Sequence, residues 1–173
     1  MSSVLALGGG CFWGLDHIFR KQFTGKGLIN IAVGYANGNA SAAEGLSYEK
    51  VCAGNTNFVE VAKLEYDSTK LPTSEILDLF FRLHDPTTVN SQGPDRGTQY
   101  KSAIFTTDEN QFKLANEIKE KFQKEWYPNK KIVTLIEPLK IFVDAEEYHQ
   151  NYLNKNKGGY ECPSHYIRSK PNI

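Results

Sequence analysis

The sequence has no excess of charge of either sign and no long hydrophobic run. Its 20 Lys and Arg residues balance its 20 Asp and Glu residues, and no basic stripe interleaved with aromatic side chains is visible. Binding to nucleic acid or to an anionic membrane requires such a concentration of positive charge. The N-terminal stretch MSSVLALGGG lacks a cationic segment, and its apolar run is too short for a signal peptide or a membrane span. We therefore predict a cytoplasmic protein without nucleic-acid or membrane partners.

Cysteine is scarce, with three residues at positions 11, 52 and 162. An odd number at wide spacing is unlike the disulfide framework of a small secreted domain and fits reduced or reactive thiols. Repeats, low-complexity segments and linkers are also missing from the sequence. A chain of 173 residues with 40% hydrophobic content is large enough for one compact core. We predict a single catalytic domain over residues 1–173, present as a monomer.

Hydrophobic periodicity predicts alternating strands and helices. The expected strands lie at 4–7, 28–36, 58–66, 101–105 and 132–139. The expected helices begin at Cys11, at about residue 73, after a capping box of Thr106 and Glu109, and at a cap of Asp144 and Glu147. Residues 37–57 and 84–100 are expected to be loops. The order predicts an α+β fold: a two-layer sandwich with a central mixed sheet, with a ferredoxin-like core and an irregular, mobile C-terminal tail over 156–173.

The segment GGGCFWG, residues 8–14, joins the first expected strand to the first expected helix. A cysteine at the start of a helix faces unsatisfied backbone N–H groups and the positive end of the helix dipole. Such surroundings lower the pKa of a thiol and favour the nucleophilic thiolate. We therefore expect Cys11 to be a reactive thiolate. The alternative is that Cys11 is a small buried hydrophobic residue.

Other interpretations of this glycine-rich segment fit less well. It lacks the third glycine of the dinucleotide-binding fingerprint and the lysine of the P-loop. It also lacks an arginine at the spacing of a phosphatase-type cysteine loop. Phe12 and Trp13 are either ordinary core residues at the start of the helix or a wall for a small apolar substrate group beside the thiol.

Cys162 lies in the irregular tail. A second thiol on a mobile segment that attacks an oxidised first thiol is the resolving arrangement of thiol redox enzymes, in which a sulfenic acid condenses to a disulfide. The alternative is an inert tail cysteine. A zinc site built from Cys162 and His165 would be incomplete, so no metal is predicted. Cys52 follows Val51 and is expected to be a packing residue.

Glu60 interrupts an otherwise apolar face of the third expected strand. In FVEVAKLEY, alternate residues share one face, and Glu60 falls in the same set as Phe58, Ala62, Leu64 and Tyr66. Burial would raise the pKa of this carboxyl and keep it protonated, ready to donate. The alternative is a glutamate at the strand edge in water or in a salt bridge.

Four segments taken together, GGGCFWG, SYEKVCAGNTNFVEV, HDPTTVNSQGPDRGTQYKSAIF and AEEYHQNYL, closely resemble the A-type peptide methionine sulfoxide reductases. The resemblance runs from about residue 4 to the tail, and GCFWG is its most specific match. It implies an enzyme that reduces the S epimer of methionine sulfoxide, free or in oxidised proteins. It also implies that no cofactor is needed and that thioredoxin or another dithiol is the external reductant.

The resemblance assigns a role to individual residues. It implies that Cys11 is the nucleophile, that Cys162 is the resolving thiol and that Glu60 is the acid. The substrate-binding residues that it implies have three roles. Phe12 and Trp13 would line the pocket for the substrate methyl group. Tyr48 and Tyr100 would offer hydroxyls to the sulfoxide oxygen, and Asp95 would belong to the same polar shell.

The chain departs from the family pattern at two places. Many members have Gly-His-Ala before the catalytic glutamate, where this chain has Asn57, Phe58 and Val59. Many also carry two tail cysteines, so the single Cys162 implies a Cys11–Cys162 disulfide presented directly to the reductant. Cys52 is not expected to act as a relay, and the match at His149 carries no assigned chemistry. Competing classes are a thiol peroxidase, a peptide-binding module and, last, a cysteine hydrolase, which lacks a clear histidine partner.

Overall fold

A six-stranded sheet forms the centre of the computed structural model, which describes residues 2–171. Its order is β7-β6-β1-β3-β2-β8, and all neighbours are antiparallel except β6 and β7, which are parallel. The mixed sheet of the prediction is therefore confirmed. Residues 1 and 172–173, the ends of the predicted domain and tail, lie outside the described residues. The strands are β1 (Ser2–Gly8), β2 (Leu28–Ala36), β3 (Val59–Asp67), β6 (Ala103–Thr106), β7 (Leu135–Pro138) and β8 (Phe142–Asp144).

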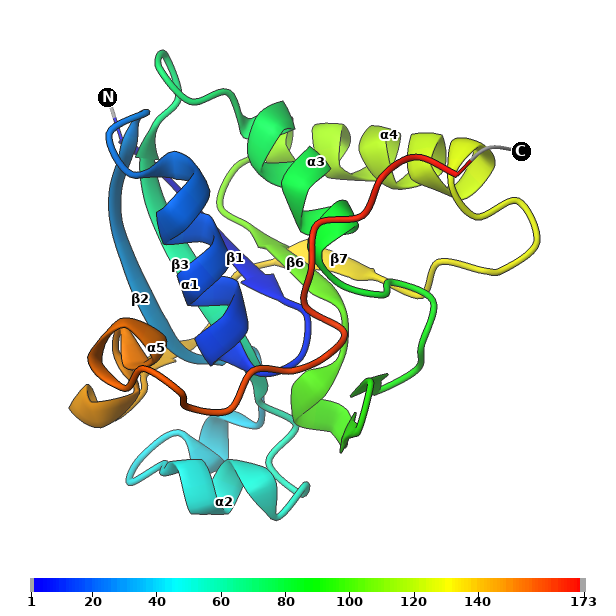
Figure 1. Cartoon of the computed structure of the whole chain (residues 1–173). Helices are drawn as coiled ribbons and strands as arrows, with labels where there is room; N and C mark the ends of the chain where they lie inside the picture. Colours follow the sequence, from blue (N-terminus) through cyan, green and yellow to red (C-terminus); the bar gives the residue numbers. More distant parts are fainter. Residues whose placement is uncertain (1, 172–173) are drawn as a thin grey trace.

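Three helices pack on one face of this sheet (Figure 1). They are α1 (Phe12–Phe23), α3 (Thr73–Leu83) and α4 (Glu109–Glu125). Their apolar residues and those of the strands form one buried cluster, to which each element contributes at its own period: Leu5 and Leu7 from β1, and Leu15 and Phe19 from α1. Fully burying one such side chain stabilises the fold by about 1.5–3 kcal/mol, so this cluster is a main source of stability.

The opposite face of the sheet carries a smaller apolar cluster. Ala6, Val61 and Phe105 belong to it, and Leu139 from the β7–β8 connection and Phe142 from β8 pack against it. Asn37 ties this connection to the end of β2, because its backbone N–H donates to the Ile141 carbonyl at 3.0 Å. The sheet is curled, and residues 139–141 join its two edge strands, β7 and β8.

The remaining elements are short and lie around the β1–α1 turn. They are the helices α2 (Tyr48–Cys52) and α5 (Tyr152–Lys155), the 3-10 turns η1 (Ala40–Ala42), η2 (Thr98–Tyr100) and η3 (Glu147–His149), and the ribbon of β4 (Ser91–Gln92) and β5 (Asp95–Arg96). In Figure 1, the orange-to-red tail after α5 crosses this turn and continues past α3 toward α4.

Four local predictions differ from the structure. The expected loop 37–57 contains α2, and the strand β8 precedes η3 where Asp144 was expected to cap a helix. Asp108, and not Thr106, caps α4, with its side chain accepting from the Gln111 N–H. The expected loop 84–100 contains the strands β4 and β5 and the 3-10 turn η2. The elements α2 and β8 are fixed by distant partners, Glu146 and β2, and not by their own pattern, whereas Asp108 caps α4 locally.

Candidate active site

Cys11 lies at the turn between β1 and α1, as the sequence predicts. It is the N-cap of α1, and 8% of it is exposed. Gly10 before it has a φ of 98°, a left-handed conformation that glycine adopts without steric cost. A Cβ atom at Gly10 would also collide with the side chain of Gln92. Glycine therefore lets the turn that carries Cys11 pack closely against the β4–β5 ribbon.

The prediction of a lowered Cys11 pKa is wrong for the substrate-free protein. Burial raises the pKa of the Cys11 thiol, and negative charge on Glu60 raises it further. The backbone N–H of Trp13, at the helix N-terminus, lowers the pKa by less than these two effects raise it. Desolvation of the sulfur thus outweighs the helix N-terminus. In the substrate-free protein, Cys11 is therefore a thiol at neutral pH.

Glu60 is fully buried in β3 and points toward the helix layer, as strand parity predicts. Its Oε1 atom accepts a hydrogen bond from the Phe12 backbone N–H at 3.3 Å, and its Oε2 atom has no hydrogen-bond partner within residues 2–171. Burial raises the pKa of Glu60 to about 8, the Phe12 N–H opposes this, and the charge of Asp95 adds to it. At neutral pH this carboxyl is therefore protonated, and its buried Oε2 atom makes no hydrogen bond to the described residues.

Two tyrosines provide neutral hydroxyl donors near this carboxyl. Tyr48 opens α2, and Tyr100 ends η2. Burial raises the pKa of both phenols, and the charge of Glu60 is the next largest cause for each. Because the charge of Glu60 raises the pKa of both phenols, both hydroxyls lie close enough to Glu60 to interact with it electrostatically. The structure therefore gathers three proton donors from β3, α2 and η2.

Aromatic rings form a fixed wall next to Cys11. Phe12 is fully buried, and its ring centroid lies 5.1 Å from that of His149 and 6.4 Å from that of Tyr48. Trp13 donates its indole N–H to His149 Nδ1 at 2.9 Å and stacks on Tyr152 at 3.8 Å between ring centroids. The indole is thus held at its edge and across its face, so its orientation is set before any substrate arrives.

Cys162 and Asp95 belong to the same cluster. Cys162 is 3% exposed, and its Sγ donates to the Gln92 carbonyl at 3.5 Å. The charges of Asp95 and Cys162 both act to raise the pKa of Cys11, and the Asp95 carboxylate accepts from the Tyr160 hydroxyl at 3.1 and 3.2 Å. The two thiols therefore share one electrostatic environment, and the structure holds all three cysteines as free thiols.

Cys52 is not the packing residue that the sequence suggests. It is exposed at the end of α2, next to the helical turn that carries Tyr48. Burial nevertheless raises its thiol pKa, and a hydrogen bond with the Tyr48 side chain opposes this. The short helix α2 turns this side chain outward. Because residues 37–57 are expected to be a loop, the sequence does not predict this orientation.

The sequence also leaves two structural supports of the site unassigned. His149 holds Trp13, as described above. Glu146 accepts from the Tyr35 hydroxyl at 3.0 Å and from the Tyr48 backbone N–H at 3.1 Å. Burial alone would raise the pKa of Glu146, but these bonds leave it lowered. Its carboxylate anchors the first turn of α2. No local pattern distinguishes Glu146 from Glu147, because its partners lie 111 and 98 residues away.

The departure at Asn57 has a conformational explanation. Asn57 has a φ of 60°, in the left-handed region where glycine is favoured and asparagine is the best tolerated alternative. The next residue, Phe58, is 1% exposed and packs so closely on Gly38 that a Cβ there would overlap its ring. The segment before Glu60 thus keeps the backbone turn that glycine would provide and fills the adjoining space with an apolar ring.

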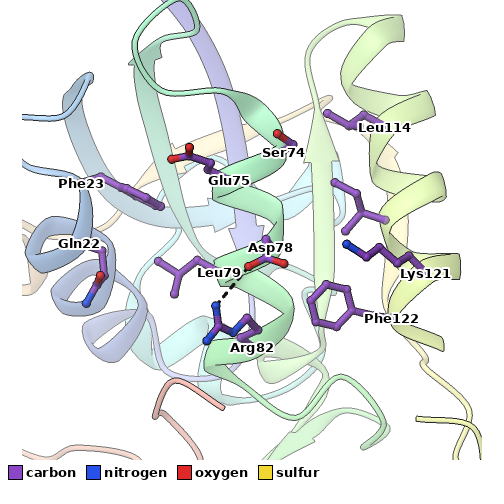
Figure 2. Close-up of a pocket in the computed structure, with 11 residues that line it drawn as sticks. Gln22, Phe23, Ser74, Glu75, Asp78, Leu79, Arg82, Leu114, Lys121 and Phe122 are labelled. Carbon is purple, nitrogen blue, oxygen red and sulfur yellow. Dashed lines mark hydrogen bonds and ion pairs between the residues drawn. The ribbon is translucent and has the colours of Figure 1, made fainter. Parts of the chain in front are cut away.

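A hollow of about 510 Å³ lies elsewhere, between α1, α3 and α4 (Figure 2). Its lining combines the apolar Phe23, Leu79 and Phe122 with the Asp78–Arg82 ion pair and shares no residue with the cluster around Cys11. We therefore place the candidate active site at the cysteine. In the described part of the chain, no three His, Cys, Asp or Glu side chains are arranged to hold a metal ion, and no helix has the length and apolar character to cross a membrane.

The site combines a thiol with a protonated buried carboxyl, neutral hydroxyl donors and a second thiol. These are the groups that a thiol-dependent oxidoreductase requires. Residues 3–172 match the family described as peptide methionine sulfoxide reductase. The chain belongs to this family.

Relatives from yeast agree over nearly the whole chain. The peptide methionine sulfoxide reductase of Saccharomyces cerevisiae is 48% identical over 168 residues, covering 95% of this chain and 90% of the relative. The crystal structure of Mxr1 from S. cerevisiae in reduced form superposes with a TM-score of 0.92 at 47% identity, covering 97% of this chain and 93% of that one. Mxr1 in complex with Trx2 gives a TM-score of 0.66 at 33% identity, covering 97% and 91%.

Proposed function

We propose that this chain reduces methionine-S-sulfoxide, free and protein-bound, to methionine. The single observation that carries the proposal is Glu60, a fully buried carboxyl whose pKa is raised to about 8 and whose Oε2 atom has no partner within residues 2–171. A sulfoxide sulfur is a poor electrophile until its oxygen receives a proton or strong hydrogen bonds. Glu60 is suited to supply that proton, with Tyr48 and Tyr100 as additional donors.

In the proposed first step, Cys11 attacks the sulfoxide sulfur while Glu60 donates to the oxygen. The sulfoxide gives up its oxygen and leaves as methionine, and the Cys11 thiol becomes a sulfenic acid through a two-electron oxidation. Because the resting thiol has a raised pKa, Cys11 loses its proton as part of the reaction with bound substrate and not beforehand. General acid assistance of this kind contributes typically 10²- to 10⁴-fold.

In the proposed second step, Cys162 attacks the sulfenic acid of Cys11. The disulfide Cys11–Cys162 forms, and water leaves. A thioredoxin-like dithiol then reduces the disulfide, so no bound cofactor takes part. The Saccharomyces relative Mxr1 has been crystallised with Trx2, which supports thioredoxin as the partner. Cys52 takes no part as a relay in this scheme.

The aromatic wall supports recognition of the substrate methyl group. Burying one methyl contributes only about 0.8 kcal/mol, so Phe12 and Trp13 act mainly by orienting the sulfoxide. We propose that this orientation presents the oxygen of the S epimer to Glu60, and that Asp95 completes the polar shell. Protection of oxidised proteins is the role that follows from this chemistry.

Three broader assignments belong to the same proposal. The order β6-β1-β3-β2, with α1 and α3 as the crossing helices, supports a ferredoxin-like core. We propose that the chain acts as one catalytic domain over 1–173, with the tail from residue 156 carrying the resolving cysteine. A monomer in the cytoplasm remains the prediction from the sequence.

The test is an assay of the purified chain with dithiothreitol on each epimer of methionine sulfoxide and on hydrogen peroxide. We expect methionine to form from the S epimer alone and peroxide to be consumed far more slowly. Peroxide consumption that exceeds sulfoxide reduction would assign the chain to the thiol peroxidases. Absence of any dithiothreitol oxidation with all three substrates would favour a peptide-binding module.

A further inference from the structure

The tail that carries Cys162 is seated on the body of the protein. Ser164 Oγ donates to Gln92 Oε1 at 2.7 Å, and the backbone N–H of Arg168 donates to the Arg82 carbonyl at 2.9 Å. Together with the bond from Cys162 to the Gln92 carbonyl, these contacts hold residues 162–168 against the β4–β5 ribbon and α3. The resolving cysteine therefore starts from a defined position.

His165 connects this seated tail directly to the turn that carries Cys11. Its Nε2 atom lies 2.7 Å from the Gly9 carbonyl oxygen, two residues before Cys11. Its backbone N–H donates to the Cys162 carbonyl at 2.9 Å, so Cys162 and His165 share one tight turn. The bonds from Ser164 and Arg168 end on other elements, whereas the imidazole bond ends on the β1–α1 turn.

The first turn of α1 is shaped to receive the imidazole. Gly14 faces the ring so closely that a Cβ atom there would overlap it, and a Cβ at Gly10 would lie 3.2 Å from Nε2. The last glycine of GGGCFWG, which no turn or positive φ requires, is thereby explained by contact with the tail. The ring and the helix fit one another at van der Waals distance only because residue 14 has no side chain.

The hydrogen bond also fixes which nitrogen carries the proton. A carbonyl oxygen only accepts, so Nε2 must be the donor. Burial lowers the pKa of His165, so the ring is neutral at pH 7 and Nδ1 carries a lone pair. Nδ1 has no hydrogen-bond partner within residues 2–171. The interaction with Gly9 is therefore the one polar contact of the imidazole that the described chain provides, and its loss would release the ring from α1.

We propose that His165 is a positioning residue for the second half of the reaction, and that it holds Cys162 beside Cys11 by its bond to Gly9. This inference rests on the proposed function. In the step concerned, the Cys162 sulfur attacks the Cys11 sulfenic acid, the S–O bond breaks and the S–S bond forms. Cys162 is oxidised, the sulfenic sulfur is reduced, and hydroxide leaves with the Cys162 proton as water.

The His165–Gly9 hydrogen bond affects the rate of disulfide formation because it keeps the Cys162 thiol close to Cys11. Without it, Cys162 keeps its bond to the Gln92 carbonyl but loses its tie to the turn that carries Cys11, and intramolecular reactions slow when the reacting groups are less well held. We expect loss of the His165 donor to slow disulfide formation about tenfold, the size of effect that one buried hydrogen bond supports. Reduction of the first sulfoxide needs no tail movement and should keep its rate.

The experiment is a single turnover without reductant, in which the reduced full chain is mixed with methionine-S-sulfoxide. Methionine release and loss of the first free thiol report the first step, and loss of a second free thiol in acid-quenched samples reports the disulfide. His165→Leu removes the donor while retaining bulk, and His165→Gln restores an N–H donor at the reach of Nε2. Arg168→Ala is the matched control, because it removes the guanidinium bonds to the Arg82 carbonyl at 3.3 Å and to the Ser164 carbonyl at 2.9 Å and leaves the Gly9 bond in place.

We expect normal methionine release in all variants, with loss of the second thiol about tenfold slower in His165→Leu, substantially restored in His165→Gln and near normal in Arg168→Ala. Equal loss of the second thiol in all variants, or equal slowing in His165→Leu and His165→Gln, would overturn the assignment. So would loss of methionine release in the His165 variants, since the residue would then serve the first step. Failure of the unmodified chain to release methionine would instead overturn the proposed function.

Discussion

Glu60 is hydrogen-bonded to the first turn of the helix that begins after Cys11: its Oε1 atom accepts from the Phe12 backbone N–H at 3.3 Å. The same helix N-terminus that would stabilise a thiolate is thus shared with a carboxyl. Since the carboxyl is protonated at neutral pH, the site stores its reactive proton on Glu60 while the Cys11 sulfur remains a thiol.

Replacing this acid should remove most of the activity. We expect Glu60→Gln to lower the rate of methionine release about 10²- to 10⁴-fold, because the amide preserves shape but donates no proton to the sulfoxide oxygen. Single-turnover kinetics with methionine-S-sulfoxide measure this. Glu65→Gln on the same strand, with its side chain on the other face, is the control and should behave like the unmodified chain. Near-normal turnover in Glu60→Gln would remove the acid assignment.

The pH dependence of methionine release should report the same group. The raised pKa of Glu60, about 8, means that its acid form is present below that pH and is lost above it. Methionine release should therefore decline as the pH rises through about 8 in the unmodified chain. In Glu60→Gln this decline should be absent, although the overall rate is low. A decline at the same pH in both proteins would assign it to another group.

Protein stability should show the cost of ionising Glu60. Its pKa is raised from 4.5 to about 8 in the folded state, so the folded chain holds this proton more tightly than the unfolded chain. The resulting stabilisation is present below pH 4.5 and is lost as the pH rises to about 8, a change of roughly 4–5 kcal/mol. Urea unfolding should therefore show Glu60→Gln gaining stability over the unmodified chain as the pH increases. A pH-independent difference would contradict this.

Glu146 should act through Tyr48. Its carboxylate accepts the Tyr48 backbone N–H and the Tyr35 hydroxyl, and a glutamine has one acceptor oxygen where two are used. We expect Glu146→Gln to reduce kcat/KM about tenfold by loosening the first turn of α2. In a Tyr48→Phe background the same change should cost less, as a double-mutant cycle would show. The exposed neighbour Glu147→Gln is the control, and full additivity in the cycle would count against the coupling.

Local sequence patterns predicted the structure correctly where a single strand or helix determines where a residue lies. The β1–α1 turn follows from glycine, cysteine and helical periodicity, and the burial of Glu60 follows from strand parity alone. Long-range contacts were not accessible in the same way. The seat of the tail depends on His165 meeting Gly9, 156 residues away, and α2 depends on Glu146. The sign of the Cys11 pKa shift also required the structure, because the helix N-terminus is visible in the sequence but desolvation and the neighbouring carboxyl are not.

The most direct test of the account is the fate of the three thiols in one turnover. The reduced chain is treated with one equivalent of methionine-S-sulfoxide without reductant, then alkylated, digested and mapped by mass spectrometry. The account predicts one methionine per chain, a disulfide between the Cys11 and Cys162 peptides, and alkylation of Cys52 alone. Methionine formation by a Cys11→Ser variant, or a disulfide that contains Cys52 in place of Cys11, would contradict it.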